Sequence, residues 1–233
     1  DEAIRAAVEQ HNEVCRLIRA IGDFRKEANP RVTGYEFHIL TLVSYVAPKH
    51  LIVDKLRETL EEIKTREPDA ADKYRARVVF VGSEVDDVDV IRLVEESGAY
   101  VCADRFCYGS LPGRDEILLN DDEDVVKQVC RQVQGRAQCP RYWDMAKMTG
   151  RRDYVADLAK EYGADGIIYE QMKFCDPWAY ERMIGTIVLR DEHGYPVLAV
   201  DRPYSIGSSG QMRTRVQAFV ESIEIKKIQG GKK

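Results

Sequence analysis

The sequence predicts an α/β protein in which helices cover both faces of a doubly wound parallel sheet, and three observations carry this prediction. From about residue 75 onward, short apolar runs alternate with segments of helical periodicity. The runs are apolar at successive positions, as in strands that are buried on both faces. Glycines stand where the helical segments end, namely Gly98, Gly135 and Gly163.

Five short segments are predicted as strands. The clearest is the run Val78-Val79-Phe80-Val81, which Gly82 closes. The five predicted strands are residues 77–81, 100–103, a short piece at 137–139, 166–169 and 196–200. Short connections between strands and helices favour parallel pairing, and about five strands suit a flavodoxin-like sheet.

The segments between these strands are predicted as helices. One opens at residues 86–89 and carries its apolar positions at 90, 91 and 94. Others are predicted over 125–133 and 154–162, and a further helix has Pro177 in its first turn. The last begins at Ser209 or Gly210 and presents an apolar face as far as Ile223.

The first 74 residues are helical in pattern, with Ile4, Val8, Cys15, Ile18 and Ile21 at helical spacing. Further helices are predicted over 35–46 and 50–65. Three helices are too few for an independent domain, so residues 1–74 are predicted to pack against an α/β lobe of residues 75–227. Residues 228–233 are predicted to form a flexible tail.

Composition excludes several classes of protein. The 233 residues include 35 Lys and Arg against 40 Asp and Glu, a formal net charge of −5, which argues against a nucleic-acid partner. The longest apolar stretch, 39–46, is far shorter than the roughly 20 residues that span a bilayer. No signal peptide is expected before this stretch. The six cysteines are interpreted as reduced thiols of a cytoplasmic protein. Because the sequence begins at Asp1, we expect a piece of a longer chain or a processed one.

Ligands of open parallel sheets bind beyond the carboxyl ends of the strands, and three cysteines follow predicted strand ends there. Cys107, Cys139 and Cys175 would share one rim. They are either incidental loop cysteines or ligands of a metal or iron–sulfur cluster. Their spacing matches neither the compact cluster motifs nor paired zinc knuckles, so both interpretations stay open. Cys15, Cys102 and Cys130 are interpreted as structural.

The segment Gly207-Ser208-Ser209-Gly210 precedes the last helix. Its backbone N–H groups could bind an anion, and Arg213 could clamp one; the alternative is a flexible loop, a helix cap and a solvated arginine. Neither a Walker A nor a GxGxxG pattern is present, which disfavours nucleotide binding by those routes.

The segment DGIIYEQMKFCDP at residues 165–177 resembles the strand-and-loop signature of the 2-hydroxyacyl-CoA dehydratase and benzoyl-CoA reductase family. Residues 210–219 resemble its closing helix, and residues 77–83 and 103–110 resemble two earlier rim loops. The resemblance covers residues 75–225, and its most specific part is Lys-Phe-Cys-Asp-Pro.

This resemblance implies a subunit with two flavodoxin-like lobes and a 4Fe–4S cluster between them, held by three cysteines. Cys175 matches the ligand from the carboxyl-terminal lobe, and Cys107 matches a neighbour of the cluster. The other two ligands are expected in an amino-terminal lobe that this sequence lacks, and Cys139 has no assignment. By the same resemblance, Ser83, Tyr108, Ser110 and Lys173 lie near cluster or substrate; the alternative is local loop bonding.

The function implied by the resemblance is that of a subunit of an oxygen-sensitive 2-hydroxyacyl-CoA dehydratase. Such an enzyme eliminates water from an acyl-CoA substrate by a ketyl-radical route. A homologous second subunit and a separate ATP-dependent iron–sulfur activator protein, which injects the electron, are its implied partners. The alternatives are a benzoyl-CoA reductase-type subunit that reduces an aromatic acyl-CoA, and a non-catalytic partner subunit or binding module. This piece alone is expected to be inactive.

Overall fold

Four parallel strands form the sheet at the centre of the computed structural model, which describes residues 1–68, 73–110, 115–136, 138–142, 144–204 and 209–230. Their order is β2-β1-β3-β4, the order of the first four strands of a flavodoxin-like sheet. The strands are β1 (Ala76–Val81), β2 (Ala99–Arg105), β3 (Gly166–Met172) and β4 (Val197–Arg202). Four of the predicted strands and their parallel pairing are therefore confirmed.

The strand predicted at 137–139 is the exception. Residues 138 and 139 have no strand structure, and residue 137 lies outside the described part. The Gln138 carbonyl, which a neighbouring strand would have used, instead accepts a hydrogen bond from the Arg105 guanidinium. Pro140, which lacks an N–H donor, follows directly.

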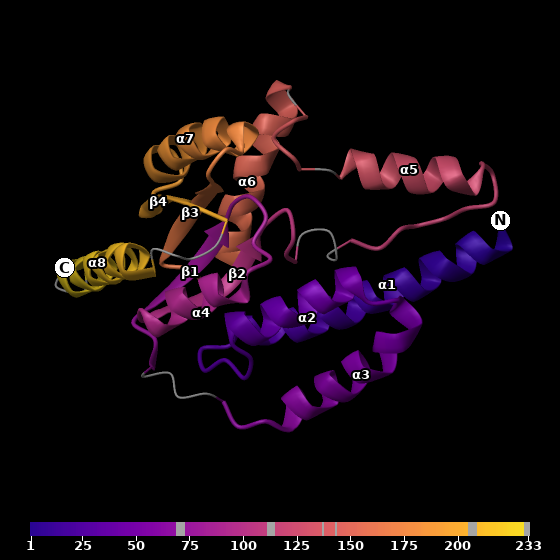
Figure 1. Ribbon diagram of the computed structural model, residues 1–233, viewed down its shortest axis with the longest axis horizontal. Helices are drawn as coiled ribbons and strands as arrows, with labels where there is room; N and C mark the ends of the chain where they lie inside the picture. Colours follow the sequence, from indigo (N-terminus) through magenta and orange to yellow (C-terminus); the bar gives the residue numbers. More distant parts are fainter. Residues whose placement is uncertain (69–72, 111–114, 137, 143, 205–208, 231–233) are drawn as a thin grey trace.

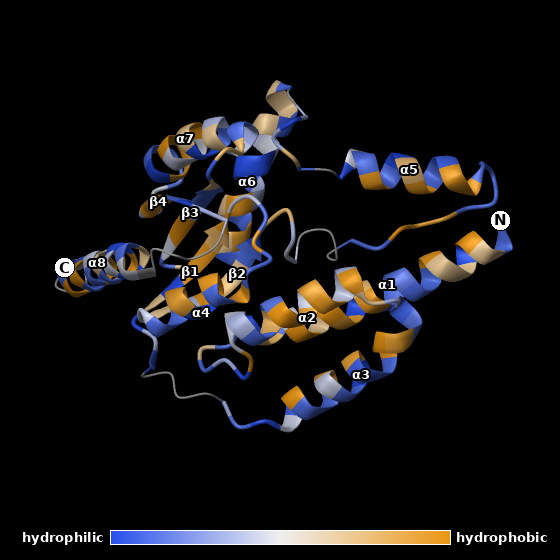
Figure 2. Cartoon of the chain, in the orientation of Figure 1, coloured by the Kyte–Doolittle hydropathy of each residue, from blue (hydrophilic) through white to orange (hydrophobic). Residues whose placement is uncertain are grey.

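Helices cover both faces of the sheet (Figure 1). One face packs against α4 (Val88–Glu96) and α8 (Ser209–Gly230), and the other against α6 (Met145–Glu161) and α7 (Asp176–Asp191). Successive residues of β1 point to opposite sides: Val78 and Phe80 join the α4/α8 core, and Val79 and Val81 join the α6/α7 core. Figure 2 shows the sheet as the most apolar part of this lobe. Residues 78–81 are all apolar because both faces of β1 are buried.

The amino-terminal helices are α1 (Glu2–Asp23), the short 3-10 helix η1 (Phe24–Lys26), α2 (Gly34–Val46) and α3 (Lys49–Thr65). α1 and α3 bury an apolar cluster that includes Ile18, Ile21 and Leu56. The start of α2 is fixed by a capping box, because Thr33 accepts from the Glu36 backbone while the Glu36 carboxylate accepts from Thr33.

A buried carboxylate from the α/β lobe holds the start of α2. Glu95 of α4 accepts hydrogen bonds from the backbone N–H groups of Gly34 at 2.8 Å, Tyr35 at 3.2 Å and Val101 at 3.3 Å. Gly34 has no room for a side chain, since an added Cβ would lie 2.6 Å from Cβ of Val101. The amino-terminal helices thus meet the α/β lobe through α2 and, by the contact of Arg25 with Asp104, through η1, both at the edge formed by β2.

α5 (Val125–Gly135) and the stretch before it lie along α1. The Asn12 amide pairs with both backbone groups of Ile117, each at 2.8 Å, and Arg16 pairs with Glu116 at 2.6 Å. α8 continues to Gly230, so residues 228–230 are helical where the sequence predicted a tail; Lys226, Lys227 and Gln229 are residues that favour a helix. Among the described helices, none combines the length and apolar character that crossing a membrane requires.

Candidate functional site

Cys107 and Cys175 lie in the segments that follow β2 and β3 at the carboxyl edge of the sheet, and Cys139 lies in the connection between α5 and α6, where the neighbouring Gln138 accepts a hydrogen bond from Arg105 at the end of β2. Cys107 is exposed, and the other two are half-buried. They lie close enough to interact electrostatically: charge on Cys139 would raise the pKa of both Cys107 and Cys175. Within the described residues, however, no three His, Cys, Asp or Glu side chains are placed to hold a metal ion together.

Cys175 lies in the sharp turn from β3 into α7. Its N–H donates to the Met172 carbonyl at 3.1 Å, and its own carbonyl accepts from Ala179 in the first turn of α7. Phe174 before it has a φ of +71°, a left-handed conformation that is uncommon outside glycine, and its side chain is 97% exposed. Burial raises the pKa of the Cys175 thiol, and the backbone N–H of Trp178 acts in the opposite direction.

Trp178, in the first turn of α7, links the Cys175 and Cys107 loops. Its indole N–H donates to the Cys107 sulfur at 3.2 Å, and its ring is buried against Tyr169 of β3. Although Cys107 as a residue is exposed, desolvation of its thiol raises the pKa of Cys107, while this hydrogen bond and the nearby Arg105 charge oppose the rise.

The other three cysteines lie away from this rim, and all six are free thiols. Cys102 is buried in β2, where burial raises its pKa to about 11 and keeps it protonated. Cys15 is buried in α1 beside His11, and Cys130 is exposed on α5. None of these three belongs to the loops at the carboxyl edge.

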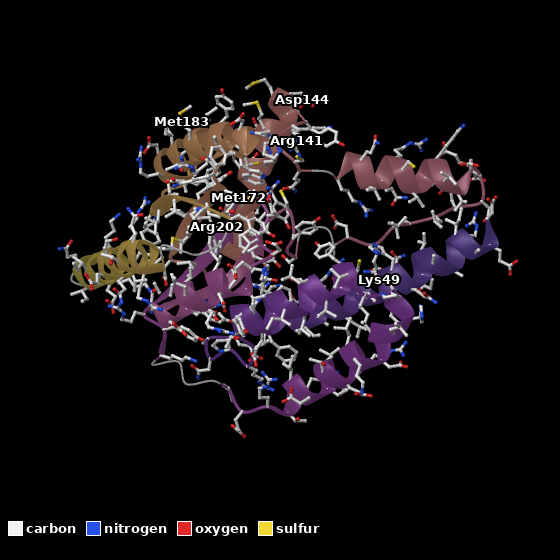
Figure 3. All side chains as sticks on the ribbon, viewed as in Figure 1. Lys49, Arg141, Asp144, Met172, Met183 and Arg202 are labelled. Atoms are coloured by element: carbon white, nitrogen blue, oxygen red, sulfur yellow. The ribbon has the colours of Figure 1, made fainter. Side chains whose placement is uncertain are left out.

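Ser83 and Glu170 form a buried network where β1 and β3 end. The Ser83 hydroxyl donates to Glu170 Oε1 at 2.6 Å and accepts from the Met172 N–H at 2.8 Å. Arg202 Nε lies 3.3 Å from the other Glu170 oxygen, and the Arg202 guanidinium also donates to the Glu84 carbonyl. Figure 3 shows Met172 and Arg202 side by side, as their register in the sheet requires. The Ser83 hydroxyl therefore donates its one hydrogen to Glu170, within the protein.

Glu170 makes the stability of the chain depend on pH. Burial raises its pKa from about 4.5 to about 7, against the opposing effects of Arg202 and Ser83. The folded state therefore binds this proton more tightly than the unfolded state, and stability falls as pH rises through that window. The contribution is roughly 3 kcal/mol. We expect Glu170→Gln, measured by urea unfolding between pH 4.5 and 8, to lose less stability over this window than the wild type.

The matched control is Glu192→Gln, an exposed position at the end of α7. It should keep the wild-type slope. Parallel curves for the wild type and Glu170→Gln would show that Glu170 does not carry the effect.

Asp104, at the end of β2, holds the Cys107 loop in place. Its carboxylate accepts from the Ser110 N–H at 2.6 Å and from Arg25 of η1 at 3.2 Å, and both charged groups are buried. The Ser110 hydroxyl donates to the Asp104 carbonyl, so it takes part in local loop bonding. Tyr108 projects outward, about half exposed, with its ring edge-on to Tyr45.

The remaining candidates lie apart from this network. Lys173 is exposed, with its ammonium 3.9 Å from the Asp201 carboxylate. Arg213 is paired with Glu96 at 2.9 Å, and Gly210 is exposed in the first turn of α8. Ser209 begins α8, and Ser208 lies outside the described residues.

Several polar residues at this edge had not been singled out from the sequence: Asp104, Arg105, Glu170, Trp178 and Arg202. A signal was present, because four of them are charged residues inside or at the end of apolar strand runs. A charge in such a place is buried and must find a partner.

Comparison with known proteins extends over almost the whole chain. Residues 1–223 match the family described as 2-hydroxyglutaryl-CoA dehydratase, D-component. The chain is 26% identical over 225 residues to the (R)-phenyllactyl-CoA dehydratase beta subunit of Clostridium sporogenes, covering 96% of this chain and 58% of that protein. It is 23% identical over 230 residues to a benzoyl-CoA reductase subunit of Thauera aromatica, covering 97% and 58%.

A third relative is the (R)-2-hydroxyglutaryl-CoA dehydratase subunit beta of Acidaminococcus fermentans, 26% identical over 180 residues, 74% of this chain and 46% of that protein. The chain thus spans less than three fifths of the length of these relatives. The family match includes the amino-terminal helices, whereas the resemblance noted from the sequence began only at residue 75.

Proposed function

The chain belongs to the 2-hydroxyglutaryl-CoA dehydratase D-component family, and from that premise we propose that it forms part of an iron–sulfur subunit of a 2-hydroxyacyl-CoA dehydratase. The observation that carries the proposal is the position of Cys175. This thiol lies half-buried at the carboxyl end of a central strand, where open α/β sheets bind their ligands. The Cys107 thiol, which follows β2, is linked to the same turn by the Trp178 indole N–H.

The chemistry of the rim suits one ligand of a cluster rather than a complete set. Thiolates are the usual ligands of iron–sulfur clusters, and Cys175 can supply one. The described residues contain no group of three ligands, so we propose that the other cysteine ligands lie outside these 233 residues. A bound 4Fe–4S cluster would supply electron transfer and, at an iron without a protein ligand, Lewis acidity.

The chain's own residues would position this site. Asp104 fixes the loop that carries Cys107, and the Ser83 hydroxyl joins the ends of β1 and β3 beside the Cys175 turn. The Trp178 N–H restrains the Cys107 sulfur. The exposed Phe174 and Tyr108 side chains flank the rim and can exclude water once a partner surface or an acyl-CoA covers it.

The reaction proposed for the whole enzyme removes the 2-hydroxyl group and a neighbouring C–H proton of a 2-hydroxyacyl-CoA as water, by a ketyl-radical route. The electron that starts the reaction would come from a separate ATP-hydrolysing iron–sulfur activator and would be recovered when the product forms, because the loss of water is redox-neutral overall. We propose a homologous second subunit as the partner and the cytoplasm as the compartment. Relatives named as beta subunits support a multi-subunit enzyme.

A ring-reducing enzyme is the second candidate, because one relative that matches 97% of this chain is named as a subunit of benzoyl-CoA reductase. Parallel assays of the whole enzyme with 2-hydroxyacyl-CoA and benzoyl-CoA would separate the two. Turnover of benzoyl-CoA alone would replace the dehydratase proposal. A stable protein with no iron and no turnover would instead indicate a non-catalytic partner subunit.

Cys175→Ala tests the ligand directly. We expect the full-length protein, purified without oxygen together with its partner subunit, to lose at least half of its bound iron and acid-labile sulfide when this thiol is removed. Cys130→Ala is the matched control, because Cys130 is exposed on α5 and away from the rim. Unchanged iron in Cys175→Ala would overturn the assignment of Cys175.

A further inference from the structure

The buried arginines of the α/β lobe and η1 are not equally balanced by negative charge. Most are within ion-pair distance of a buried carboxylate: Arg25 of Asp104 at 3.2 Å, Arg202 of Glu170 at 3.3 Å, and Arg151 and Arg152 of Glu181 at 2.8 and 3.1 Å. Arg105, at the end of β2, is only 2% exposed and has no carboxylate partner among the described residues. Only Asp69 and Asp72, of all Asp and Glu side chains, lie outside those residues.

Arg105 contacts or adjoins all three segments that carry the rim cysteines. Cys107 follows it by two residues on its own strand end. Its guanidinium donates to the backbone carbonyl of Gln138 and, at 3.2 Å, to the Gln138 side-chain oxygen, next to Cys139. It also lies over the ring of Trp178, with 4.8 Å between the guanidinium carbon and the ring centroid, in the helix that Cys175 begins.

A guanidinium in this position needs a negative charge. Arginine stays protonated in proteins, and a buried charge is costly unless an opposite charge compensates it. The acceptors on Gln138 are neutral, and burial lowers the pKa of Arg105 accordingly. Glu181, the carboxylate of the neighbouring α6/α7 contact, is already shared between two arginines. The positive charge of Arg105 is therefore not balanced by a carboxylate in direct contact within the described residues, although the Glu84 charge acts on Cys107 and Cys175.

We propose that Arg105 is the buried counter-cation of the anionic iron–sulfur cluster to which Cys175 would supply one thiolate, and that its charge makes this cluster easier to reduce. The inference rests on the proposed function. Its physical basis is that reduction adds a negative charge, which a nearby uncompensated cation stabilises. Arg105 would act on the cluster through space and is a positioning residue rather than a ligand.

The test is the reduction potential of the cluster, measured by EPR-monitored titration of the full-length protein with its partner subunit. We expect Arg105→Met, which removes the charge and keeps the length, to lower the equilibrium constant of one-electron reduction about tenfold, equivalent to about 59 mV. Arg190→Met is the matched control, because it makes the same change in net charge at an exposed site on α7. Its constant should stay within about twofold of the wild-type value.

The substitution Gln138→Glu is a second test of the effect of the Arg105 charge, and it keeps the arginine in place. A carboxylate at the position that already accepts from Arg105 Nε would neutralise the guanidinium without creating a cavity. It should lower the constant in the same direction, and it decides the question if Arg105→Met fails to fold. Loaded protein with an unchanged potential in Gln138→Glu, or in a folded Arg105→Met, would overturn this inference alone. Iron-free wild-type protein would overturn the proposed function and this inference with it.

Discussion

Replacing Asp104 by alanine is expected to destabilise the folded chain by about 3–5 kcal/mol, because it leaves a buried arginine without its counter-charge. Arg25 is 1% exposed and donates through Nη1 to Asp104, while its Nε and Nη2 atoms have no hydrogen-bond partner among the described residues. The Ser110 N–H would lose its acceptor as well. The measurement is urea unfolding followed by circular dichroism.

A double variant separates the lost charge pair from a general packing defect. When Arg25→Met is added to Asp104→Ala, the stranded charge disappears, and we expect the double variant to be more stable than Asp104→Ala alone. Asp122→Ala, at an exposed position, should change stability by no more than about 0.5 kcal/mol. A double variant less stable than Asp104→Ala would contradict the account of Asp104 as the counter-charge of Arg25.

Glu181→Gln is expected to have an effect of similar size, about 3–5 kcal/mol, because one carboxylate serves two buried arginines. Glu181 joins α7 to α6 through Arg151 at 2.8 Å and Arg152 at 3.1 Å. Arg151 also donates to the Tyr142 carbonyl at 3.2 Å, which ties down the segment carrying Cys139. Urea unfolding measures the loss, and faster amide exchange over residues 138–142 should accompany it.

Glu192→Gln, on the exposed end of the same helix, is the control for this substitution. It should leave both stability and exchange near the wild-type values. If Glu181→Gln unfolds at the wild-type urea concentration, the two arginines do not depend on this carboxylate.

Much of the fold was predictable because it follows from local patterns. The run at 78–81 is apolar at every position, since both faces of β1 meet a layer of helices. Each of the predicted helices is present, although α6 begins at Met145, well before the predicted residue 154. The prediction of a strand at 137–139 was wrong. A short segment becomes a strand only if its backbone hydrogen-bonds to a neighbouring strand, and the Gln138 carbonyl accepts a hydrogen bond from the Arg105 side chain instead.

The candidate site was predictable only in outline. Strand order places the Cys107 and Cys175 segments at the carboxyl edge, as the rule for parallel sheets predicts, but Cys139 follows no strand and its segment meets this edge through the contact of Gln138 with Arg105. The partners of Ser83 and Arg105 could not be anticipated, since Glu170 and Gln138 are 87 and 33 residues away in the chain. Charge balance depends on such long-range neighbours, so a guanidinium that has no carboxylate partner among the described residues becomes visible only in the folded molecule.

The sequence by itself determined the layers of this protein, its parallel sheet and the family signature around Cys175, because periodicity and short motifs are local properties of a chain. Only the tertiary structure decided which buried charges are paired, that α2 begins on a carboxylate from α4, and that Arg105 lies among the three cysteine segments with no carboxylate partner in the described part of the chain. The physical reason is that hydrogen bonds and Coulomb interactions act over a few ångströms in space, whatever the separation along the chain.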